Sequence, residues 1–308
     1  MNSELTQIIK REAQKLGFSF CSISRVVSLN NEEIHLKKWL ENKYHGEMLF
    51  MENHQEKRID PKLLFDNAKS VISVGLNYFI KEINNKDTYK IAKFAYGKDY
   101  HYIIKDRLSK LIDLIKEINP DVNARAFVDS APVMDKAWAQ RSGIGWIGKN
   151  TCVINKKSGS FFLLGEIITD IELESDQEEK DHCGNCSKCI DICPTNALIA
   201  PHVLDARKCI SYLTIEYKKD LPNDLKDKFN NYIFGCDICQ DVCPWNIKSA
   251  VPHNDAELMP DERLVNLTKE DWENLSPKQF KDIFKNTCLE RTGYKRIMRN
   301  INHIRSTI

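Results

Sequence analysis

The sequence lacks several features that would directly indicate a function, such as an excess of one charge or a long apolar run. It has no excess of either charge, with 45 lysines and arginines against 44 aspartates and glutamates. No apolar run approaches the roughly 18 residues of a membrane span, and residues 1–15 are amphipathic and polar, unlike a signal peptide. No low-complexity tract is present, and 42% of the residues are hydrophobic. We therefore exclude a membrane-spanning or wholly disordered chain, and we expect a cytoplasmic protein.

Cysteine, by contrast, is abundant. Eight of the eleven cysteines fall between Cys183 and Cys243. Disulfides are disfavoured in a reducing cytoplasm, so cysteines that cluster in such a chain usually bind metal. A chain of 308 residues is also long enough for two domains with cores of their own.

Helical and strand-like patterns alternate through the first 170 residues. Apolar residues recur at helical spacing over 5–16 and 101–118, and Pro132 suits the first turn of a helix that reaches Ser142. Short apolar runs predict strands over 18–23, 71–76, 124–128 and 161–168. This mixture predicts a layered α/β domain within an α+β chain.

Two charged segments mark the ends of the cysteine-rich part. Residues 170–181 hold seven acids and one lysine, a composition typical of a solvated linker. Residues beyond about 250 favour helices, and eight basic residues face two acidic ones between 278 and 305. We therefore predict three parts: 1–170, 171–250 with the cysteines, and a basic helical segment over 251–308.

The cysteines form two motifs with a shared ending. The first is Cys183-x2-Cys186-x2-Cys189-x3-Cys193-Pro194, and the second is Cys236-x2-Cys239-x3-Cys243-Pro244. The first spacing is that of bacterial ferredoxins with two [4Fe–4S] clusters, in which the cysteine before proline ligates the other cluster. Cluster one then takes Cys183, Cys186, Cys189 and Cys243. Cluster two takes Cys193, Cys236 and Cys239, and Cys209 is the thiolate available to complete it.

Zinc is the alternative ligand for paired cysteines. A structural zinc site needs four ligands and has no use for two Cys-Pro endings. Two [4Fe–4S] clusters explain all eight cysteines and carry single electrons, so this domain is predicted to conduct electrons to chemistry elsewhere in the chain.

Residues 143–148 (GIGWIG) match the GxGxxG pattern of dinucleotide-binding proteins, but they follow a predicted helix where that fingerprint requires a strand. We interpret them as a tight loop, either packed under Trp146 or set against a bulky planar cofactor. Residues 99–101 (DYH) resemble the start of a DxHxxG signature, in which a histidine ligates cobalt, but position 104 is isoleucine and not glycine. We therefore expect His101, at the start of a predicted helix, to make an ordinary hydrogen bond and not to bind cobalt. Asp129 ends a predicted strand, where a carboxylate is a helix cap or a catalytic acid.

Several segments together resemble the epoxyqueuosine reductase family, which completes queuosine synthesis in tRNA. They are residues 46–48 (GEM), 57–61 (KRIDP), 97–101 (GKDYH), 127–133 (FVDSAPV), 141–151 (RSGIGWIGKNT) and 232–246 (YIFGCDICQDVCPWN). The resemblance runs from about residue 2 to 250. Many members continue into a HEAT-like helical module, and only residues 287–304 resemble its beginning.

The resemblance implies cobalamin held between an N-terminal cobalamin-binding domain and a ferredoxin-like domain. It implies Asp129 as proton donor, with a pKa raised by burial near the corrin. The implied cobalamin contacts are Arg58, Ala92, Asp129, Lys149, Asn150, Val153, Leu164, Ser211, Cys236 and Asp237. The implied substrate is tRNA with a GUN anticodon carrying epoxyqueuosine, contacted by Lys218 and Lys219. The electron donor is unidentified, and we expect a monomer.

Two alternatives remain open at this point. A cobalamin-dependent reductive dehalogenase shares the cofactor and the paired clusters, although such proteins usually carry a twin-arginine export signal. A non-catalytic ferredoxin-type electron carrier would need neither cobalamin nor Asp129.

Overall fold

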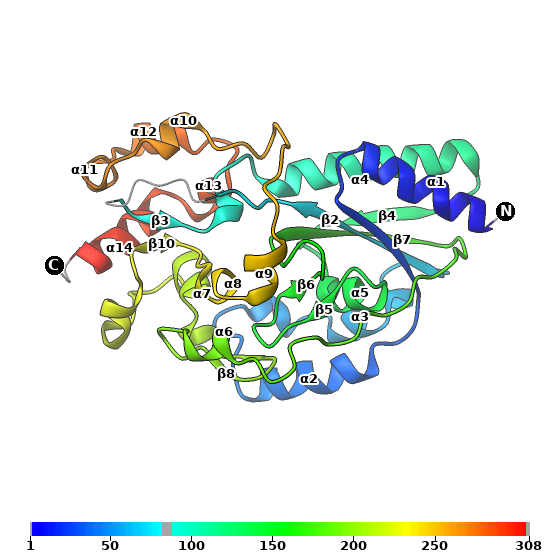
Figure 1. The fold of residues 1–308 in the computed structure, drawn as a ribbon, viewed down its shortest axis with the longest axis horizontal. Helices are drawn as coiled ribbons and strands as arrows, with labels where there is room; N and C mark the ends of the chain where they lie inside the picture. Colours follow the sequence, from blue (N-terminus) through cyan, green and yellow to red (C-terminus); the bar gives the residue numbers. More distant parts are fainter. Residues whose placement is uncertain (1, 82–87, 306–308) are drawn as a thin grey trace.

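A four-stranded antiparallel sheet forms the centre of the N-terminal part (Figure 1). The structure is a computed structural model and describes residues 2–81 and 88–305. The strands, in spatial order, are β1 (Phe20–Arg25), β2 (Ser70–Asn77), β7 (Phe162–Thr169) and β4 (Ala124–Phe127). All four predicted strands are confirmed, with small shifts of their ends.

Helices cover both faces of this sheet (Figure 1). One face carries α1 (Asn2–Lys15) and α4 (Tyr100–Ile118), which confirms both predicted helices. The other carries α2 (Asn30–Glu41), α3 (Gln55–Ile59) and α5 (Asp135–Arg141). Side chains alternate between the faces along each strand, so Ile72 of β2 packs with α1 and α4 while Val71 packs with α5.

The helix predicted from Pro132 begins three residues later, at Asp135. Tight turns occupy the intervening segment, since the Ser130 amide donates to the Val128 carbonyl and the Val133 amide to the Ala131 carbonyl. Asp129 itself has a left-handed backbone conformation, with φ of 50°. We call residues 128–134 the Asp129 loop; it connects β4 to α5.

The acidic segment over 170–181 is not the free linker that its composition predicts. Leu173 is only 5% exposed. Asp176 accepts hydrogen bonds from the Ile23 amide at 2.8 Å and from Lys10 Nζ at 2.6 Å. The segment therefore packs along β1 and α1, because it carries apolar and pairing residues among its acids.

The cysteine-rich part consists of short elements that pack against the sheet domain and the C-terminal helices (Figure 1). They are α6 (Lys188–Asp191), β8 (Leu198–Ala200), β9 (Val203–Leu204), α7 (Ile210–Ile215), β10 (Tyr232–Phe234), α8 (Ile238–Asp241) and α9 (Pro244–Ser249). β10 pairs in parallel with β3 (Lys90–Ile91). Residues 146–154 form a small hairpin of β5 (Trp146–Ile147) and β6 (Val153–Ile154). Short 3-10 helices occur at η1 (Leu49–Met51), η2 (Pro61–Leu63), η3 (Lys93–Ala95), η4 (Ala206–Lys208) and η5 (Asn223–Lys228).

The C-terminal segment is helical, as the sequence predicts. It comprises α10 (Glu262–Val265), α11 (Lys269–Glu273), α12 (Pro277–Ile283), α13 (Cys288–Thr292) and α14 (Tyr294–Arg305). Ile297 and Ile301 of α14 share one core with Phe229 and Ile233 of the cysteine-rich part. None of the helices in the described segments is long and apolar enough to cross a membrane.

Candidate active site

Electrostatic interactions link motif cysteines into two groups. Cys189 interacts with Cys183 and Cys243, which we call the first group, and Cys236 interacts with Cys209 and Cys193, which we call the second group. Cys239 also lies with the second group. Within residues 2–81 and 88–305, no three His, Cys, Asp or Glu side chains converge as the ligands of a single metal ion.

The two groups differ in their exposure. In the first motif Gly184, Asn185 and Lys188 are exposed, so this group lies at the molecular surface. In the second motif Asp237 and Gln240 are buried. Burial raises the pKa of the Cys236 thiol to about 12, which again marks the second group as the deeper one.

The GIGWIG loop packs against the first cysteine motif. Trp146 is fully buried, its indole N–H lies 3.4 Å from Cys183 Sγ, and its ring meets Trp245 edge-on. Lys149 Nζ donates to the carbonyls of Gly184 and Cys186. Trp146 therefore faces the cysteine motif. The left-handed φ of 81° at Gly143 fits the predicted tight loop.

A cavity of about 1280 Å³ opens beside this loop. Its walls come from α2, the segment over 50–58, the Asp129 loop, the start of α5 and the β8–β9 hairpin, with Glu216 and Arg291 at one side. Drug-sized ligands occupy pockets of roughly 300–1,000 Å³. This cavity is therefore large enough for a bulky cofactor together with part of a substrate.

Asp129 lies in this cavity at the centre of a hydrogen-bonded group. Its side chain is 63% exposed to the cavity. The Tyr100 hydroxyl donates to Asp129 Oδ2 at 2.8 Å, and His101 Nε2 lies 3.6 Å from the same oxygen. The other ring nitrogen of His101 lies 2.7 Å from Asp99 Oδ1, and Asp99 also caps α4.

The expected rise in the pKa of Asp129 is not found. Desolvation raises the pKa of Asp129, but the contacts from His101 and Tyr100 outweigh it, and the net pKa is lowered. Burial lowers the pKa of His101, yet Asp129 and Asp99 raise it to about 9 overall. At neutral pH the proton of this pair therefore resides on the imidazole.

Sequence reasoning missed Tyr100 and His101 as partners of Asp129. The expected hydrogen bond of His101 is present, to Asp99. The first turn of α4 also points these two side chains across the sheet edge at the end of β4. Only the GKDYH match offered a signal, since the two segments are far apart in the chain.

Of the cobalamin contacts implied by the resemblance, Arg58 and Asp129 line the cavity. Arg58 is buried, and its Nη2 donates to the Phe50 carbonyl at 2.9 Å. Ile147 and Thr151 line the cavity on either side of Lys149 and Asn150, which themselves turn toward the cysteine motifs.

The other implied contacts lie outside this lining. Val153 and Leu164 pack in a small apolar cluster under α5. Ala92 is buried against Gly235, and the Ala92 amide donates to the Phe234 carbonyl. Asp237 is buried and accepts from the Lys93 amide. Ser211 lies on α7, beside the second cysteine group.

Lys218 and Lys219 lie just after α7. Lys219 is exposed, and its Nζ lies 2.6 Å from Glu47 Oε1. Glu216, two residues before Lys218, is part of the cavity wall. The two lysines thus lie two and three residues after a cavity-lining residue.

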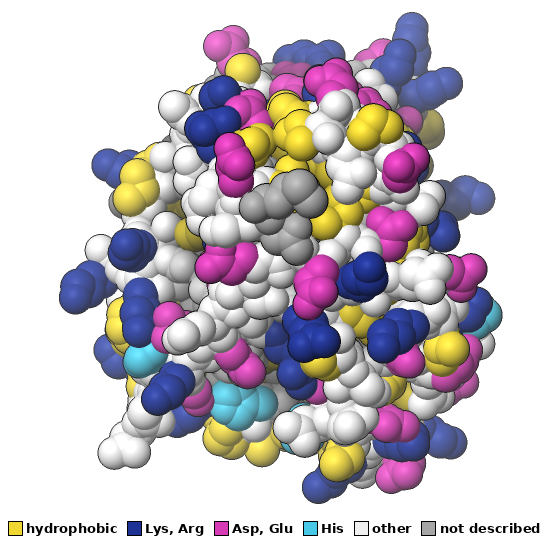
Figure 2. Space-filling view, turned by 90° about the vertical axis from the view of Figure 1, so that its right-hand side faces the viewer, with side chains coloured by type: hydrophobic (Ala, Val, Ile, Leu, Met, Phe, Trp, Pro, Cys, Tyr) yellow, Lys and Arg dark blue, Asp and Glu magenta, His cyan; other side chains and the backbone are white. Residues whose placement is uncertain are grey.

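The basic C-terminal residues are only partly a free charged surface. Arg296 donates to the Ile215 carbonyl, and Arg299 donates to the carbonyls of Leu213, Tyr217 and Lys219. Arg291 pairs with Glu216. These side chains fasten the C-terminal helices to the end of α7. Elsewhere, on the face shown in Figure 2, basic and acidic side chains are interspersed.

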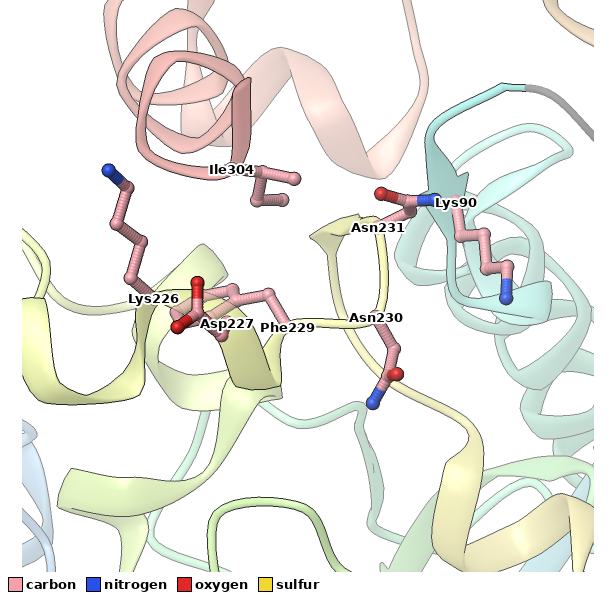
Figure 3. A pocket seen from close by; sticks show the side chains of 7 residues that line it. All are labelled: Lys90, Lys226, Asp227, Phe229, Asn230, Asn231 and Ile304. Carbon is pink, nitrogen blue, oxygen red and sulfur yellow. The ribbon is translucent and has the colours of Figure 1, made fainter. Parts of the chain in front are cut away.

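A second, smaller cavity of about 330 Å³ shares no residue with the first (Figure 3). It is lined by Lys90, Lys226, Asp227, Phe229, Asn230, Asn231 and Ile304. None of the predicted site residues contributes to it.

Comparisons with known proteins agree with this arrangement. The family model described as "Epoxyqueuosine reductase QueG, DUF1730" matches residues 58–130, and the "4Fe-4S double cluster binding domain" matches residues 182–246. An epoxyqueuosine reductase of Cellulophaga algicola is 49% identical over 300 residues, covering 97% of this chain and 98% of the relative.

Solved structures share the fold. An epoxyqueuosine reductase with an epoxyqueuosine-modified tRNA-Tyr stem loop is 32% identical, with a TM-score of 0.88 over 98% of this chain and 80% of that one. The Bacillus subtilis enzyme, with its catalytic aspartate loop swung out of the active site, is 30% identical, with a TM-score of 0.88 over 98% and 81%. A catabolic reductive dehalogenase is 15% identical, with a TM-score of 0.50 over 98% and 38%, which shows a shared fold alone. With nearly half of its residues identical to a full-length relative, the chain belongs to the epoxyqueuosine reductase family.

Proposed function

We propose that this chain reduces epoxyqueuosine to queuosine in tRNA, with the cavity at Asp129 as its active site. One observation carries the proposal: residues 146–151 touch both the cavity and the cysteine motifs. Ile147 and Thr151 line the cavity that holds Asp129, while Trp146, Lys149 and Asn150 contact the two motifs. An electron-transfer unit thus adjoins a chamber that contains a proton-donating group.

The reaction removes one oxygen atom from an epoxide. Both C–O bonds of the ring break, a C=C bond forms, and the oxygen leaves as water after taking up two electrons and two protons. Side chains supply protons but not electrons of low potential, so cofactors must deliver the electrons.

The side chains around Asp129 can hold and deliver the first proton of the reaction. Negative charge develops on the epoxide oxygen as the ring opens, and an acid at that point stabilises it. The Asp129–His101 pair holds one proton, which His101 carries in the free site. We propose that Asp129 delivers this proton to the oxygen and that His101 replenishes it.

Cobalamin fits the large cavity. The cavity exceeds the usual size of a small-molecule pocket and is walled by both the sheet domain and the β8–β9 hairpin. Bound there, cobalamin would supply a metal centre of low potential to the epoxide. We propose Arg58 and Asp129 as contacts from the cavity wall, and Ala92, Lys149, Asn150, Val153, Leu164, Ser211, Cys236 and Asp237 as further contacts carried over from the family.

Two [4Fe–4S] clusters fit the two cysteine groups. We propose Cys183, Cys186, Cys189 and Cys243 for the first, and Cys193, Cys209, Cys236 and Cys239 for the second. Because the first group lies at the surface, we propose that the unidentified electron donor delivers its electrons there. We also propose that the cobalamin-binding, ferredoxin-like and C-terminal parts are residues 1–170, 171–250 and 251–308.

The nucleic-acid partner is proposed to be tRNA with a GUN anticodon. RNA-modifying proteins combine phosphate contacts with a base turned out of the stack. Lys218 and Lys219 follow the cavity-lining Glu216, so they can contact phosphates beside a nucleotide inserted into the cavity. We expect a monomer in the cytoplasm, where tRNA resides. We also propose that the Asp129 loop of this chain can swing out of the active site, as the catalytic aspartate loop does in the Bacillus subtilis relative.

The alternatives make different demands. A ferredoxin-type carrier needs no large cavity with a hydrogen-bonded acid. A reductive dehalogenase would accept organohalides and would not need tRNA.

The decisive experiment is anaerobic. The protein is reconstituted with iron, sulfide and cobalamin, reduced, and supplied with tRNA carrying epoxyqueuosine; mass spectrometry of the digested nucleosides reports the loss of one oxygen. We expect queuosine only when cobalamin is present, and none from Asp129→Asn. If the tRNA stays unchanged while cobalamin is bound and reducible, epoxyqueuosine is not the substrate. Organohalides would then be tested as substrates.

A matched pair of variants tests the tRNA contact. Lys219→Gln should weaken tRNA binding and reduce its salt dependence by about one released counterion. Lys110→Gln, on the exposed side of α4, should leave both unchanged. Binding by Lys219→Gln with the wild-type affinity and salt dependence would remove this lysine from the interface.

A further inference from the structure

Glu166 is an acidic residue buried within the central sheet. It lies within β7, its side chain is 0% exposed, and no N–H or O–H in the described part of the chain donates to either carboxylate oxygen. Ser73, which pairs with Glu166 from β2, has a buried hydroxyl that also finds no partner among the residues that the structure describes. An ionised carboxylate is very costly in such a place, so Glu166 is expected to be a neutral acid.

The polar group that faces Glu166 is another carboxyl, that of Asp135. Asp135 is the first residue of α5 and lines the large cavity. Burial raises the pKa of Glu166 well above its usual range, and burial also raises that of Asp135. Two facing carboxyls with one proton form a hydrogen bond in which the neutral acid donates to the carboxylate.

The surrounding charges decide which carboxyl keeps the proton. The charged groups that act on the pair are Asp129 from the loop, Lys136 from α5 and Arg58 from α3. The two cations act on Asp135, whereas the groups that shift the pKa of Glu166 are the acids Asp135 and Asp129. Asp135 therefore carries the negative charge, and Glu166 carries the proton.

This pair connects the two ends of the Asp129 loop. Glu166 pairs with Phe127 in the sheet, at the residue before the loop begins. Its side chain meets Asp135, directly after the loop ends. Two backbone hydrogen bonds within the loop are local, from the Ser130 amide to the Val128 carbonyl and from the Val133 amide to the Ala131 carbonyl. The Glu166–Asp135 contact is thus well placed to hold the loop against the sheet.

We propose that Glu166 is a positioning residue whose carboxylic acid donates to Asp135 and so clamps the Asp129 loop over the cavity. Its importance for turnover rests on the proposed role of Asp129. When Glu166 loses its proton, two negative charges face each other at short range with little screening, and the clamp opens. The loop is therefore held in place by a proton and released as pH rises through the pKa of Glu166.

Hydrogen exchange of residues 128–134, followed by mass spectrometry on the reconstituted protein, tests the clamp without substrate. Glu166→Gln keeps a neutral donor and should retain wild-type protection at neutral pH. Glu166→Met keeps the length but not the donor, and should exchange about tenfold faster, the worth of one hydrogen bond to a charged group. The exposed Glu172→Gln is the matched control and should match wild type. Wild-type protection in Glu166→Met would overturn the proposal.

The proton itself gives a second readout. Infrared difference spectra of wild type against Glu166→Gln should contain the carbonyl band of a protonated carboxylic acid, shifted in heavy water; a spectrum without that band would overturn the proposal. As pH rises, the loop of wild type should lose protection relative to that of Glu166→Gln. Neither readout requires turnover, so an enzyme that leaves epoxyqueuosine unchanged refutes the proposed function while the clamp is judged separately.

Discussion

The hydroxyl of Tyr100 donates a 2.8 Å hydrogen bond to Oδ2 of Asp129, which joins the start of α4 to the loop after β4. His101 lies 3.6 Å from the same oxygen. Both groups favour the ionised carboxylate and together lower the pKa of Asp129 against the effect of desolvation. The protonation of this site is therefore set by residues from two separate segments.

Tyr100→Phe should raise the pKa of Asp129, because it removes a donor to the carboxylate. An acid with a lowered folded-state pKa stabilises the fold above its unfolded pKa and loses that contribution as pH falls. The variant should therefore lose less stability than wild type on acidification. Thermal unfolding at steps from neutral to acidic pH measures this; identical acid profiles for both proteins would contradict it.

His101→Gln should change stability in the opposite range of pH. The pKa of His101 is raised to about 9, so its stabilising contribution is complete below its unfolded pKa and is lost as pH rises through about 9. Wild type should exceed the variant in melting temperature most clearly near pH 6, and the difference should shrink toward pH 9. A difference that stays constant over this range would show that the imidazolium is not the cause.

Trp146→Phe should make the reduction potential of the proposed first cluster more negative. Hydrogen bonds to cluster sulfurs influence the potential, and this variant removes the indole donor 3.4 Å from Cys183 Sγ. Redox titration followed by electron paramagnetic resonance measures the shift. Trp272→Phe, in the C-terminal core, is the control for a lost buried indole and should leave the potential unchanged.

Cys209→Ser should remove the second cluster and spare the first, reducing bound iron from about eight to about four atoms per chain. Iron and sulfide analysis after reconstitution tests this, with Cys21→Ser as a control that keeps both clusters. Cys152 is the rival ligand, since it also lies beside Cys239. Loss of the cluster from Cys152→Ser but not from Cys209→Ser would reverse the assignment.

Asn300→Ala should destabilise the attachment of α14. Asn300 is fully buried, and its Nδ2 donates to the carbonyls of Thr214 and Ile233. An unpaired buried polar group costs about 1–3 kcal/mol, so the melting temperature should fall by several degrees. The exposed Lys295→Ala on the same helix should change it little. Equal melting temperatures for the two variants would contradict this assignment.

The sequence by itself determined the elements whose signal is local. Hydrophobic periodicity predicted the four central strands and helices α1 and α4, because alternation and helical spacing report which side of an element is buried. The cysteine spacing also predicts two sets of cluster ligands, since short loops restrict where neighbouring thiolates can lie, and these sets remain predictions. The acidic composition of residues 170–181 wrongly predicted a free linker. Leu173 of this segment is buried, and Asp176 accepts hydrogen bonds from α1 and β1.

Only the tertiary structure decided how the site is assembled. Tyr100 and Asp129 are 29 residues apart, and no periodicity relates them. Glu166 occupies a strand position that the hydrophobic pattern alone would assign to an apolar residue. Its proposed role can be inferred only from the tertiary structure, in which Asp135 faces it. The physical reason is the same in both cases: the pKa of a carboxyl depends on burial and on neighbouring charges, and long-range packing sets both.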